Sequence, residues 1–471
     1  MHNGGVTTLP LAWARGWAAD PGRAVLLTDH DLWSAHDVAE QTAVRARRLA
    51  GLGVVAGDRV VVSARTTPHL VLAHVALLRL GAVVVPVNPA AAPREVSHVV
   101  KVVRPVAAVT DRPDRFPGPE LLVTTPDLPV LAGPDVPLDH APPGAAALIG
   151  FTSGTTGAPK GAVHTHATLL AGCRSLVTAW QWTPQDRLVH ALPLFHVHGL
   201  GVGLYASLLA GASVRLLDKF SVDAVLDAVS EPESTLFFGV PTMYDRLLRS
   251  PRAGELARLR LLVSGSAPLP PELFARIERV TGSAPVERYG MTETLMLTSN
   301  PVDGARRAGT VGLPLPGVEL RLTSGGQVEV RGPNVFEGYW EDADADRAAF
   351  TTDGWFRTRD VGELPDGGYL RLVGRSSELI ITGGFNVYPR EVEDVLRQVD
   401  GVTDIAVVGL PDDEWGEVVT AFVVGRASEA DLEAAAEAGL SPYKRPRVWQ
   451  RLDALPRNAM GKVERRRLRP A

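Results

Sequence analysis

A glycine-rich stretch from Phe151 to His166 holds the residues whose types and spacing best suit chemistry. Glycines let a chain turn tightly with its N–H groups pointing inward, hydroxyls add donors, and a lysine adds a mobile positive charge, so together they suit a phosphate. These residues are Gly154, Gly157, Gly161, Thr152, Ser153, Thr155, Thr156 and Lys160. A P-loop is excluded, because Pro159 precedes the lysine and a glycine follows it. A flexible Gly/Thr linker is the alternative, but linkers rarely combine glycines with so many donors.

The flanking sequence indicates how this stretch is held. The apolar run Ala145–Ile149 predicts a strand before it, and the amphipathic segment Ala167–Trp180 predicts a helix after it. We therefore expect a phosphate-binding loop between a strand and a helix.

A second cluster, Glu287–Thr294, offers three different kinds of contact. Tyr289 has a flat face for adenine, Thr292 has a hydroxyl for a phosphate oxygen, and Glu293 has a hard carboxylate suited to Mg²⁺. ATP needs all three kinds of contact. The alternative is an ordinary loop around a buried tyrosine.

Two further loops carry weaker signals. Pro193–Gly199 contains His196 and His198, where we expect no metal, because no acidic residue or further histidine lies nearby in the sequence. Ser264–Leu269 places small residues before a helix that is expected from Pro271, which is a common arrangement.

Helix-like and strand-like segments alternate along most of the chain, which favours βα units on largely parallel sheets. Pro68–Leu80 has proline at its start and glycine after its end, which predicts a helix. Short β-rich pieces from Ala308 to Val373 predict a small β subdomain, and Leu379–Ala471 is expected to form a compact domain. The strand-like and β-rich runs are Arg59–Ser63, Ala82–Val87, Ala107–Thr110, Gln327–Arg331 and Tyr369–Val373. Strand and helix patterns repeat over Asp186–Ala191, Leu200–Leu209, Ser213–Leu217, Leu236–Gly239 and Leu261–Ser264.

Length and composition limit the class of protein. A chain of 471 residues is too long for one ordinary core and implies two or three packed units. A net charge of −5, with both signs spread along the chain, argues against nucleic acid as a main partner. The chain has no apolar run long enough for a spanning helix, and Met1–Asp20 lacks a secretory pattern, so we expect a cytoplasmic protein. The single Cys173 excludes an internal disulfide and is expected in the core.

These motifs, in this order, resemble the adenylate-forming superfamily, which contains acyl- and aryl-CoA synthetases, adenylation domains of peptide synthetases, and luciferases. Thr152–Lys160 is similar to the phosphate-loop signature of that family. The resemblance implies an α/β fold, with a large N-terminal domain of βα-layered sheets plus a small β subdomain, and a small mobile α+β C-terminal domain. It implies domains at 1–374 and 379–471, with a hinge at 375–378 that contains Ser377.

The resemblance also implies how ATP is bound. Asp360 matches the ribose-binding aspartate, Arg375 matches an arginine near ribose and phosphate, and Glu293 with Thr156 is expected to hold Mg²⁺. Arg359 stands where the family usually has glycine. The residues expected to contact ATP are Thr152, Ser153, Gly154, Thr155, Gly157, Lys160, Ser266, Ala267, Glu287, Tyr289, Gly290, Met291, Thr292, Asp360 and Arg375.

Lys462 lies in a Pro-Arg-Asn-x-x-Gly frame and matches the lysine that bridges the carboxylate and the α-phosphate during adenylation. Outside such a frame, a lysine near a basic C-terminus would be read as a solvated charge. Thr156, Glu293 and His196 complete the expected catalytic group, and His196 matches the residue where acid and thiol approach.

The glycine-rich turn in Thr382–Glu391 resembles the turn along which the pantetheine arm of coenzyme A runs. Gly383, Gly384 and Phe385 are therefore expected to contact CoA. Rotation of the small domain would bring this turn to the site for the second step.

The expected function is an ATP-dependent acid–CoA ligase that forms an acyl adenylate, releases pyrophosphate and transfers the acyl group to CoA. Arg288 stands where many family members have a small residue, and arginine pairs with a carboxylate in a two-pronged geometry. With His196 and Ser264, it is expected to bind a second carboxylate of the substrate. The motifs closely resemble those of malonyl-CoA synthetases, which implies malonate or methylmalonate.

Several alternatives stay open. A fatty- or aryl-acid CoA ligase has the same chemistry with another acid, and a stand-alone adenylating enzyme would load the thiol of a separate acyl-carrier protein. A paralogue that binds nucleotide without chemistry is disfavoured, because Lys160, Glu293, Asp360 and Lys462 are all present.

Overall fold

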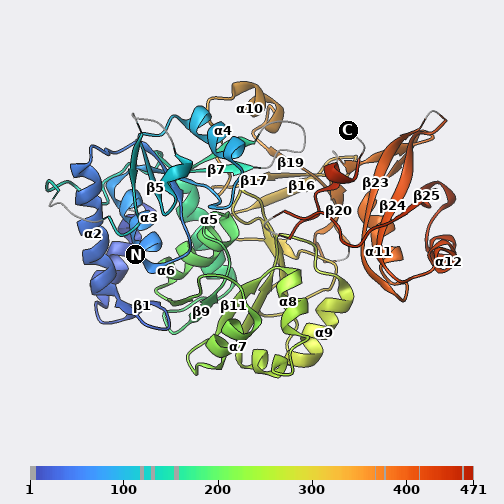
Figure 1. Cartoon of the computed structure of the whole chain (residues 1–471), viewed down its shortest axis with the longest axis horizontal. Coiled ribbons are helices and arrows are strands. Elements are labelled where there is room, and N and C mark those ends of the chain that lie inside the picture. Colours follow the sequence, from blue (N-terminus) through green and yellow to red (C-terminus); the bar gives the residue numbers. More distant parts are fainter. Residues whose placement is uncertain are drawn as a thin grey trace.

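The computed structural model describes residues 7–116, 121–128, 133–152, 159–365, 367–375, 378–412, 414–458 and 461–469. Figure 1 shows a large N-terminal part and a separate C-terminal domain at the right, which follows strand β20 (Arg371–Arg375). Across these described ranges, every helix is too short or too polar to cross a bilayer.

Two sheets organise the large part. The β3 sheet contains, in spatial order, β18 (Gly338–Tyr339), β8 (Lys160–Thr165), β7 (Ala146–Thr152), β4 (Val83–Pro86), β3 (Arg59–Ser63), β5 (Ala107–Thr110) and β6 (Leu122–Thr124). The β11 sheet contains β15 (Leu313–Pro314), β14 (Thr298–Ser299), β13 (Val286–Tyr289), β12 (Leu261–Ser264), β11 (Leu236–Gly239), β9 (Arg187–His190), β10 (Ser213–Leu216), β1 (Ala24–Leu27) and β2 (Leu32–Ser34). In the first sheet, the strands from β3 through β7 pair in parallel with their neighbours. In the second sheet, β1 and the strands from β9 through β13 do the same. This parallel pairing confirms the predicted βα units.

Helices cover both sheets and fill the space between them. They are α1 (Leu9–Ala19), α2 (Ala35–Gly51), α3 (Pro68–Leu80), α4 (Pro93–Val103), α5 (His166–Ala179), α6 (Ala206–Ala210), α7 (Val222–Ser230), α8 (Pro241–Leu247), α9 (Pro271–Thr281) and α10 (Ala343–Ala349). A π-helix, η2 (His198–Tyr205), and two short 3₁₀ turns, η1 (Pro113–Arg115) and η3 (Ala253–Arg258), complete this part.

Side-chain alternation along the strands separates the apolar layers. Val60 of β3 and Phe238 of β11 belong to one core between the sheets, whereas their neighbours Val61 and Phe237 belong to two outer cores. Helix α3 contributes to the middle core and is buried on every side from Leu70 to Leu80, as expected of a helix that is apolar all round. Cys173 of α5 lies in the same core, as predicted.

The β17 sheet forms the small β subdomain that the sequence predicts. Its antiparallel strands are β16 (Glu319–Leu322), β17 (Gln327–Arg331), β19 (Phe356–Glu363) and β20.

The C-terminal domain is built on the β24 sheet, with the order β22 (Phe385–Val387), β21 (Ile380–Thr382), β24 (Gly416–Gly425), β23 (Val402–Asp412), and β25 (Val448–Arg451) paired to β24. Helices α11 (Pro389–Leu396) and α12 (Glu429–Gly439) share one apolar core with the sheet, and a second core lies with alternate residues of β23. Two 3₁₀ turns, η5 (Pro442–Lys444) and η6 (Arg465–Leu468), follow. This arrangement is α+β, as predicted.

One local prediction was wrong. Lys160–Thr165 forms β8, which pairs antiparallel with β7, and α5 begins only at His166. The glycine-rich stretch therefore joins two strands rather than a strand and a helix. Lys160, Gly161 and Ala162 are residue types that are depleted in strands. The conformation of this segment follows from pairing with β7 and β18, which sequence periodicity does not reveal.

A capping box fixes the start of α5 directly after β8. Thr165 Oγ1 accepts the N–H of Thr168 at 3.2 Å, and Thr168 Oγ1 accepts the N–H of Thr165 at 3.0 Å. Both residues are buried. We expect Thr165→Ala to lower the free energy of unfolding by about 1 kcal/mol, which denaturant unfolding of the intact chain would measure. Thr178→Ala, at an exposed position of the same helix, should change it by less than about 0.5 kcal/mol. Equal losses in both variants would contradict the assigned role of the cap.

Candidate active site

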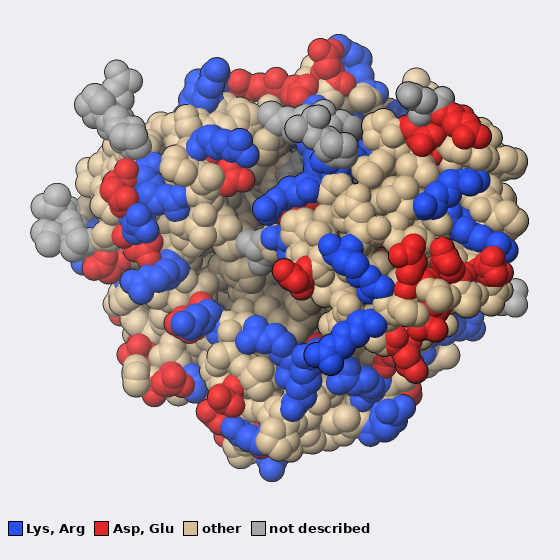
Figure 2. All heavy atoms as spheres, turned by 45° about the vertical axis from the view of Figure 1, so that its right-hand side comes forward, with Lys and Arg blue, Asp and Glu red and all other residues tan. Residues whose placement is uncertain are grey.

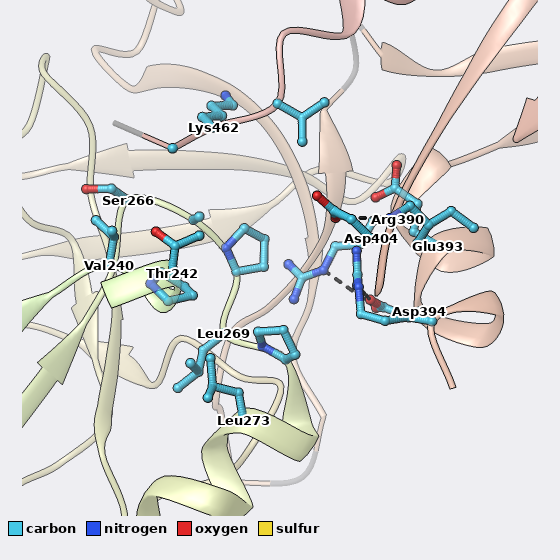
Figure 3. Close-up of a pocket in the computed structure, with 18 of the residues that line it drawn as sticks. Val240, Thr242, Ser266, Leu269, Leu273, Arg390, Glu393, Asp394, Asp404 and Lys462 are labelled. Carbon is cyan, nitrogen blue, oxygen red and sulfur yellow. Dashed lines mark hydrogen bonds and ion pairs between the residues drawn. The ribbon is translucent and has the colours of Figure 1, made fainter. Parts of the chain in front are cut away.

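Two cavities meet where the large part faces the C-terminal domain. The larger, of about 760 Å³, is bordered by both parts, and the smaller, of about 420 Å³, enters the large part beside β7 and β8. Figure 2 shows a hollow on this face with Lys and Arg side chains along its rim. In Figure 3, Thr242 and Leu269 lie across the larger cavity from Arg390 and Asp394 of α11. The residues that line both cavities are Ser266, Arg288, Gly290, Arg375 and Lys462.

Strand ends explain this location. Parallel strands β9, β11, β12 and β13 all finish at one edge of the β11 sheet, and the loops that follow carry the predicted motifs. The carboxyl edge of a parallel sheet is where ligands bind in open α/β folds. The sheet therefore gathers motifs that are far apart in the sequence.

Asp360 and Arg375 face each other on antiparallel strands β19 and β20. Arg375 Nε lies 2.9 Å from Asp360 Oδ1, and the hydroxyl of Tyr289 donates to the other carboxylate oxygen. The negative charge of Asp360 raises the pKa of Arg375. Tyr289 and Asp360 both line the larger cavity, which brings together the predicted adenine and ribose contacts.

Arg359, beside Asp360, has a φ of 63°. This left-handed conformation favours glycine, which the resembled family usually has there. The arginine adopts the conformation that glycine would adopt more easily.

The described ends of the phosphate-binding stretch lie at the smaller cavity. Thr152 and Lys160 line it together with Thr292 and Glu293. Lys160 Nζ is 3.0 Å from a carboxylate oxygen of Asp342 and forms an ion pair with it. Ser153, Gly154, Thr155, Thr156 and Gly157 lie outside the described residues.

Glu293 provides a buried carboxylate at the smaller cavity. The hydroxyl of Tyr339 donates to its Oε1 at 3.0 Å, and burial raises the pKa of Glu293. The backbone carbonyl of Thr292 accepts from His164 Nε2 at 2.6 Å. Sequence reasoning missed Tyr339 and His164, and no local motif could have found them, because each reaches this loop through tertiary contact. Within the described ranges no three His, Cys, Asp or Glu side chains are grouped to hold a metal ion.

Lys462 follows a tight turn. Its backbone N–H donates to Asn458 Oδ1 at 3.0 Å, its carbonyl accepts the N–H of Asn458 at 2.9 Å, and Gly461 has a φ of 74°. Burial and the nearby charge of Arg375 lower the pKa of Lys462 to about 8. A cavity-lining lysine with a lowered pKa is typical of a functional group.

Arg288 places a guanidinium at the junction of the cavities. Its Nε and Nη2 are buried and have no hydrogen-bond partner among the described residues. Burial lowers the pKa of Arg288 to about 9. Gly265, which sequence reasoning did not assign, provides the space: a Cβ atom at this position would lie 2.2 Å from Arg288 Cζ.

Two histidines line the smaller cavity near Arg288. Burial and the charge of Arg288 lower the pKa of His196 to about 4, and the same causes lower the pKa of His198, so both imidazoles are neutral at neutral pH. His198 Nδ1 lies 3.0 Å from the hydroxyl of Ser266. Ser264 lines neither cavity, and its hydroxyl is buried without a partner in the described chain.

The remaining predicted ATP contacts divide between the cavities. Ala267, Glu287 and Gly290 line the larger one, and Gly290 and Met291 line the smaller one. Glu287 Oε1 accepts the N–H of Leu269 at 2.9 Å, and burial raises the pKa of Glu287 to about 7.

The predicted CoA turn lines neither cavity. Gly383 and Gly384 have φ values of 55° and 79° between β21 and β22, and Phe385 is 52% exposed and stacks on Tyr443. The predicted hinge residue Ser377 lies outside the described residues.

Comparison with known proteins shows similar chains. A malonate–CoA ligase from Arabidopsis thaliana is 38% identical over 365 residues, which are 69% of this chain and 60% of that protein. The chain spans about three fifths of the length of the curated relatives that it matches.

Solved structures are also similar. ATP-bound MatB from Rhodopseudomonas palustris matches with a TM-score of 0.92 and 35% identity over 98% of both chains. A malonyl-CoA ligase product complex with methylmalonyl-CoA and AMP is 40% identical, with a TM-score of 0.70 over 93% of this chain and 97% of that chain.

Family comparison covers both parts of the chain. The AMP-binding enzyme family matches residues 13–340, and the AMP-binding enzyme C-terminal domain matches residues 391–462. Since the first match alone covers well over half of the chain, this protein belongs to the AMP-binding enzyme family.

Proposed function

We propose that this chain is an ATP-dependent acid–CoA ligase whose acid is a small dicarboxylate, malonate or methylmalonate. It would form the acyl adenylate with release of pyrophosphate and then transfer the acyl group to coenzyme A. The names of the similar malonate–CoA ligase and of the malonyl-CoA ligase complex support this acid.

The observation that carries the proposal is the buried guanidinium of Arg288. An isolated charge is costly to bury, and the described residues offer its Nε and Nη2 no partner. A substrate carboxylate would supply that partner. The reacting carboxylate must lie near Lys462, which lines the same junction, so an acid that serves both groups needs two carboxylates.

The walls beside Arg288 fit a short carbon chain. Val197, Val202, Met291 and Leu295 line the smaller cavity, and these side chains suit a methylene or methyl group. The neutral His196 adds no second positive charge to this pocket.

The residues present also fit ATP and Mg²⁺. Mg²⁺ commonly uses one or two protein carboxylates and completes its octahedral shell with water and phosphate oxygens, which suits the buried Glu293. When bound, the ion would neutralise phosphate charge. Thr156, predicted as its other ligand, lies outside the described residues. Lys160, Thr292 and Lys462 would donate to phosphate oxygens from two sides of the smaller cavity.

In the first step, a carboxylate oxygen of the acid attacks the α-phosphorus of ATP, and pyrophosphate leaves with the electron pair of the broken P–O bond. The protein has no proton to move, so its contribution is positioning and neutralisation of charge. Lys462 would hold the attacking carboxylate and the α-phosphate together, while Asp360 would hold the ribose.

The second step would require a different surface. The thiol of CoA gives its proton to solvent and attacks the acyl carbon, and AMP leaves with the electron pair of the broken C–O bond. The Gly383–Gly384 turn, however, lines neither cavity. The TM-score of this chain is 0.92 with the ATP-bound structure and 0.70 with the product complex, although its sequence identity to the product complex is higher. This difference supports two domain arrangements within the family. We infer that the described arrangement serves adenylate formation and that rotation of the C-terminal domain brings the turn to the site.

The direct test is thioester formation with ATP and CoA across malonate, methylmalonate, acetate, octanoate and benzoate, with AMP and pyrophosphate measured in parallel. Preference for malonate or methylmalonate is expected. Preference for a monocarboxylate would overturn the assigned acid but keep the ligase, and no pyrophosphate release with any acid would overturn the ligase. Holo acyl-carrier protein in place of CoA tests the alternative thiol.

Arg288→Ala should lower kcat/KM for malonate on the order of 10² to 10³, because removing one partner of a buried charge pair costs about 2 to 5 kcal/mol. Activity with acetate should not fall in parallel, since acetate has no second carboxylate. Both rates are measured as pyrophosphate release.

Gly265→Ala offers an independent route to the same result, because its Cβ would occupy the position of the guanidinium. Gly254→Ala is the matched control, since a Cβ atom there meets nothing within 4 Å. A Gly265→Ala enzyme that keeps its malonate preference would refute this account of selectivity.

The lowered pKa of Lys462 predicts the pH dependence of adenylation. The ammonium form is the active one, and its pKa in the free enzyme is about 8, below the ordinary 10.5. We therefore expect kcat/KM for ATP–pyrophosphate exchange to fall as pH rises through about 8. Lys462→Arg keeps its charge to much higher pH, so whatever activity it retains should lack this decline. An identical decline in both enzymes would assign the titration to another group.

A further inference from the structure

We propose that Arg465 is a positioning residue for Lys462. It would hold the C-terminal tail, defined as residues 452–469, so that the lysine reaches the junction of the cavities when the acyl adenylate forms. The inference rests on the proposed function for the role of Lys462, while the placement of the tail can be tested separately.

The tail has little regular structure to fix its position. Its described part contains only the turn η6 and an isolated bridge between Arg457 and Val463. Leu455 and Leu468 pack with Ala406 and other residues of the β24 sheet. Apolar contacts of this kind keep the tail on the sheet but are not directional, so they do not define where a side chain points.

Arg465 supplies directional contacts. Its Nη2 lies 2.6 and 2.8 Å from the two carboxylate oxygens of Glu393 on α11, and its Nη1 lies 3.5 Å from Glu378. The side chain of Glu393 is only 7% exposed and that of Arg465 19%, so solvent screens this ion pair weakly. The tail is therefore joined to α11 and to Glu378, the last residue of the predicted hinge.

The same ion pair also binds the edge of the sheet. Strand β23 is the last strand in the sheet order, so outward backbone groups of Val407 have no neighbouring strand. Glu393 Oε1 accepts the N–H of Val407 at 2.7 Å, and Arg465 Nε donates to the backbone carbonyl of Val407 at 3.3 Å. The pair thus connects helix, strand and tail at a single point.

This point lies close to Lys462 along the chain. Arg465 follows the lysine by three residues, and the ion pair of Arg457 with Asp404 holds the other side of the turn. In Figure 3, Lys462 lies on the side of the cavity where Ser266 and Thr242 of the large domain lie, and Glu393 and Asp404 lie on the opposite side. A Cβ atom on Gly461 would lie 3.4 Å from Thr242 Oγ1, so the turn rests directly against the large domain. A displacement of about 1 Å at such a site can cost on the order of 10² in rate.

The first experiment compares the two half-reactions in Arg465→Gln, Arg465→Lys and Arg467→Ala. ATP–pyrophosphate exchange with malonate reports adenylate formation, and thiol release from malonyl-CoA with AMP reports the second step in reverse. Arg467 is the matched control, because its side chain is 67% exposed and pairs only with Glu464 among the described acidic residues.

We expect Arg465→Gln to lower kcat of the exchange by about 10- to 100-fold, with KM for malonate unchanged and thiol release affected less than about threefold. Arg465→Lys should recover part of the exchange rate, and Arg467→Ala should match wild type. Equal losses in both half-reactions would mean that Arg465 only stabilises the domain, and unchanged exchange would overturn the proposal.

The second experiment needs no activity. Acetylation of lysine amines by acetic anhydride, followed by mass spectrometry, reports the accessibility of Lys462 relative to Lys444, which pairs with Glu391 in the same domain. Lys462 should be labelled faster in Arg465→Gln than in wild type, and Arg467→Ala should not change its rate. Unchanged labelling in Arg465→Gln would overturn the placement. A wild-type enzyme without pyrophosphate exchange would instead overturn the proposed function, and labelling would still decide the placement.

Discussion

Positive charge buried where two cavities meet is the constraint on which this structure depends. Arg288, Arg375 and Lys462 all line the junction, and of these only Arg375 forms an ion pair with a described carboxylate, that of Asp360. Burial lowers the pKa of Arg288 and Lys462, because holding these charges away from water is costly. Anionic ligands would remove that cost. The carboxylate and phosphate groups of the proposed substrates would do so.

The fold concentrates these charges by bringing strand ends together. Arg288 lies on β13 and needs Gly265 at the end of β12, because any side chain there would collide with the guanidinium. Lys462 comes from the other domain, on a tail that side-chain contacts hold against the β24 sheet. The first cation is therefore fixed by the β11 sheet and the second by contacts within the C-terminal domain. In the proposed reaction, this difference would suit two steps that need the acid in one place and the lysine only in the first step.

Neutral groups lie beside the buried charges. His196 and His198 lie beside Arg288, and both have pKa values below the usual range, so they add no repulsion at neutral pH. Ser266, whose hydroxyl contacts His198, has a φ of 68°, a conformation that non-glycine residues adopt at a cost. The backbone strain and the buried imidazoles occur at the same wall of the cavity, where they shape the space in front of the guanidinium.

Much of the fold could be predicted from local patterns. The helix Pro68–Leu80 and the strands Arg59–Ser63 and Ala107–Thr110 occur with the predicted bounds, because proline, glycine and β-branched residues act on the backbone within a few positions. Strand β8 was missed, because its conformation follows from pairing with β7 and β18. Local chemistry specified elements, and partners distant in the chain specified how they pair.

The same division applies to the site. The sequence by itself determined which residue types are available and in what order, and the structure brings Tyr289, Asp360, Arg375 and Lys462 to the larger cavity. Only the tertiary structure decided that Ser264 lines neither cavity and that Tyr339 donates to Glu293. It alone decided that Arg288 is buried without a described partner. Burial, pairing and pKa depend on groups that are far apart along the chain and meet only in the folded protein, whereas residue type and local conformation do not.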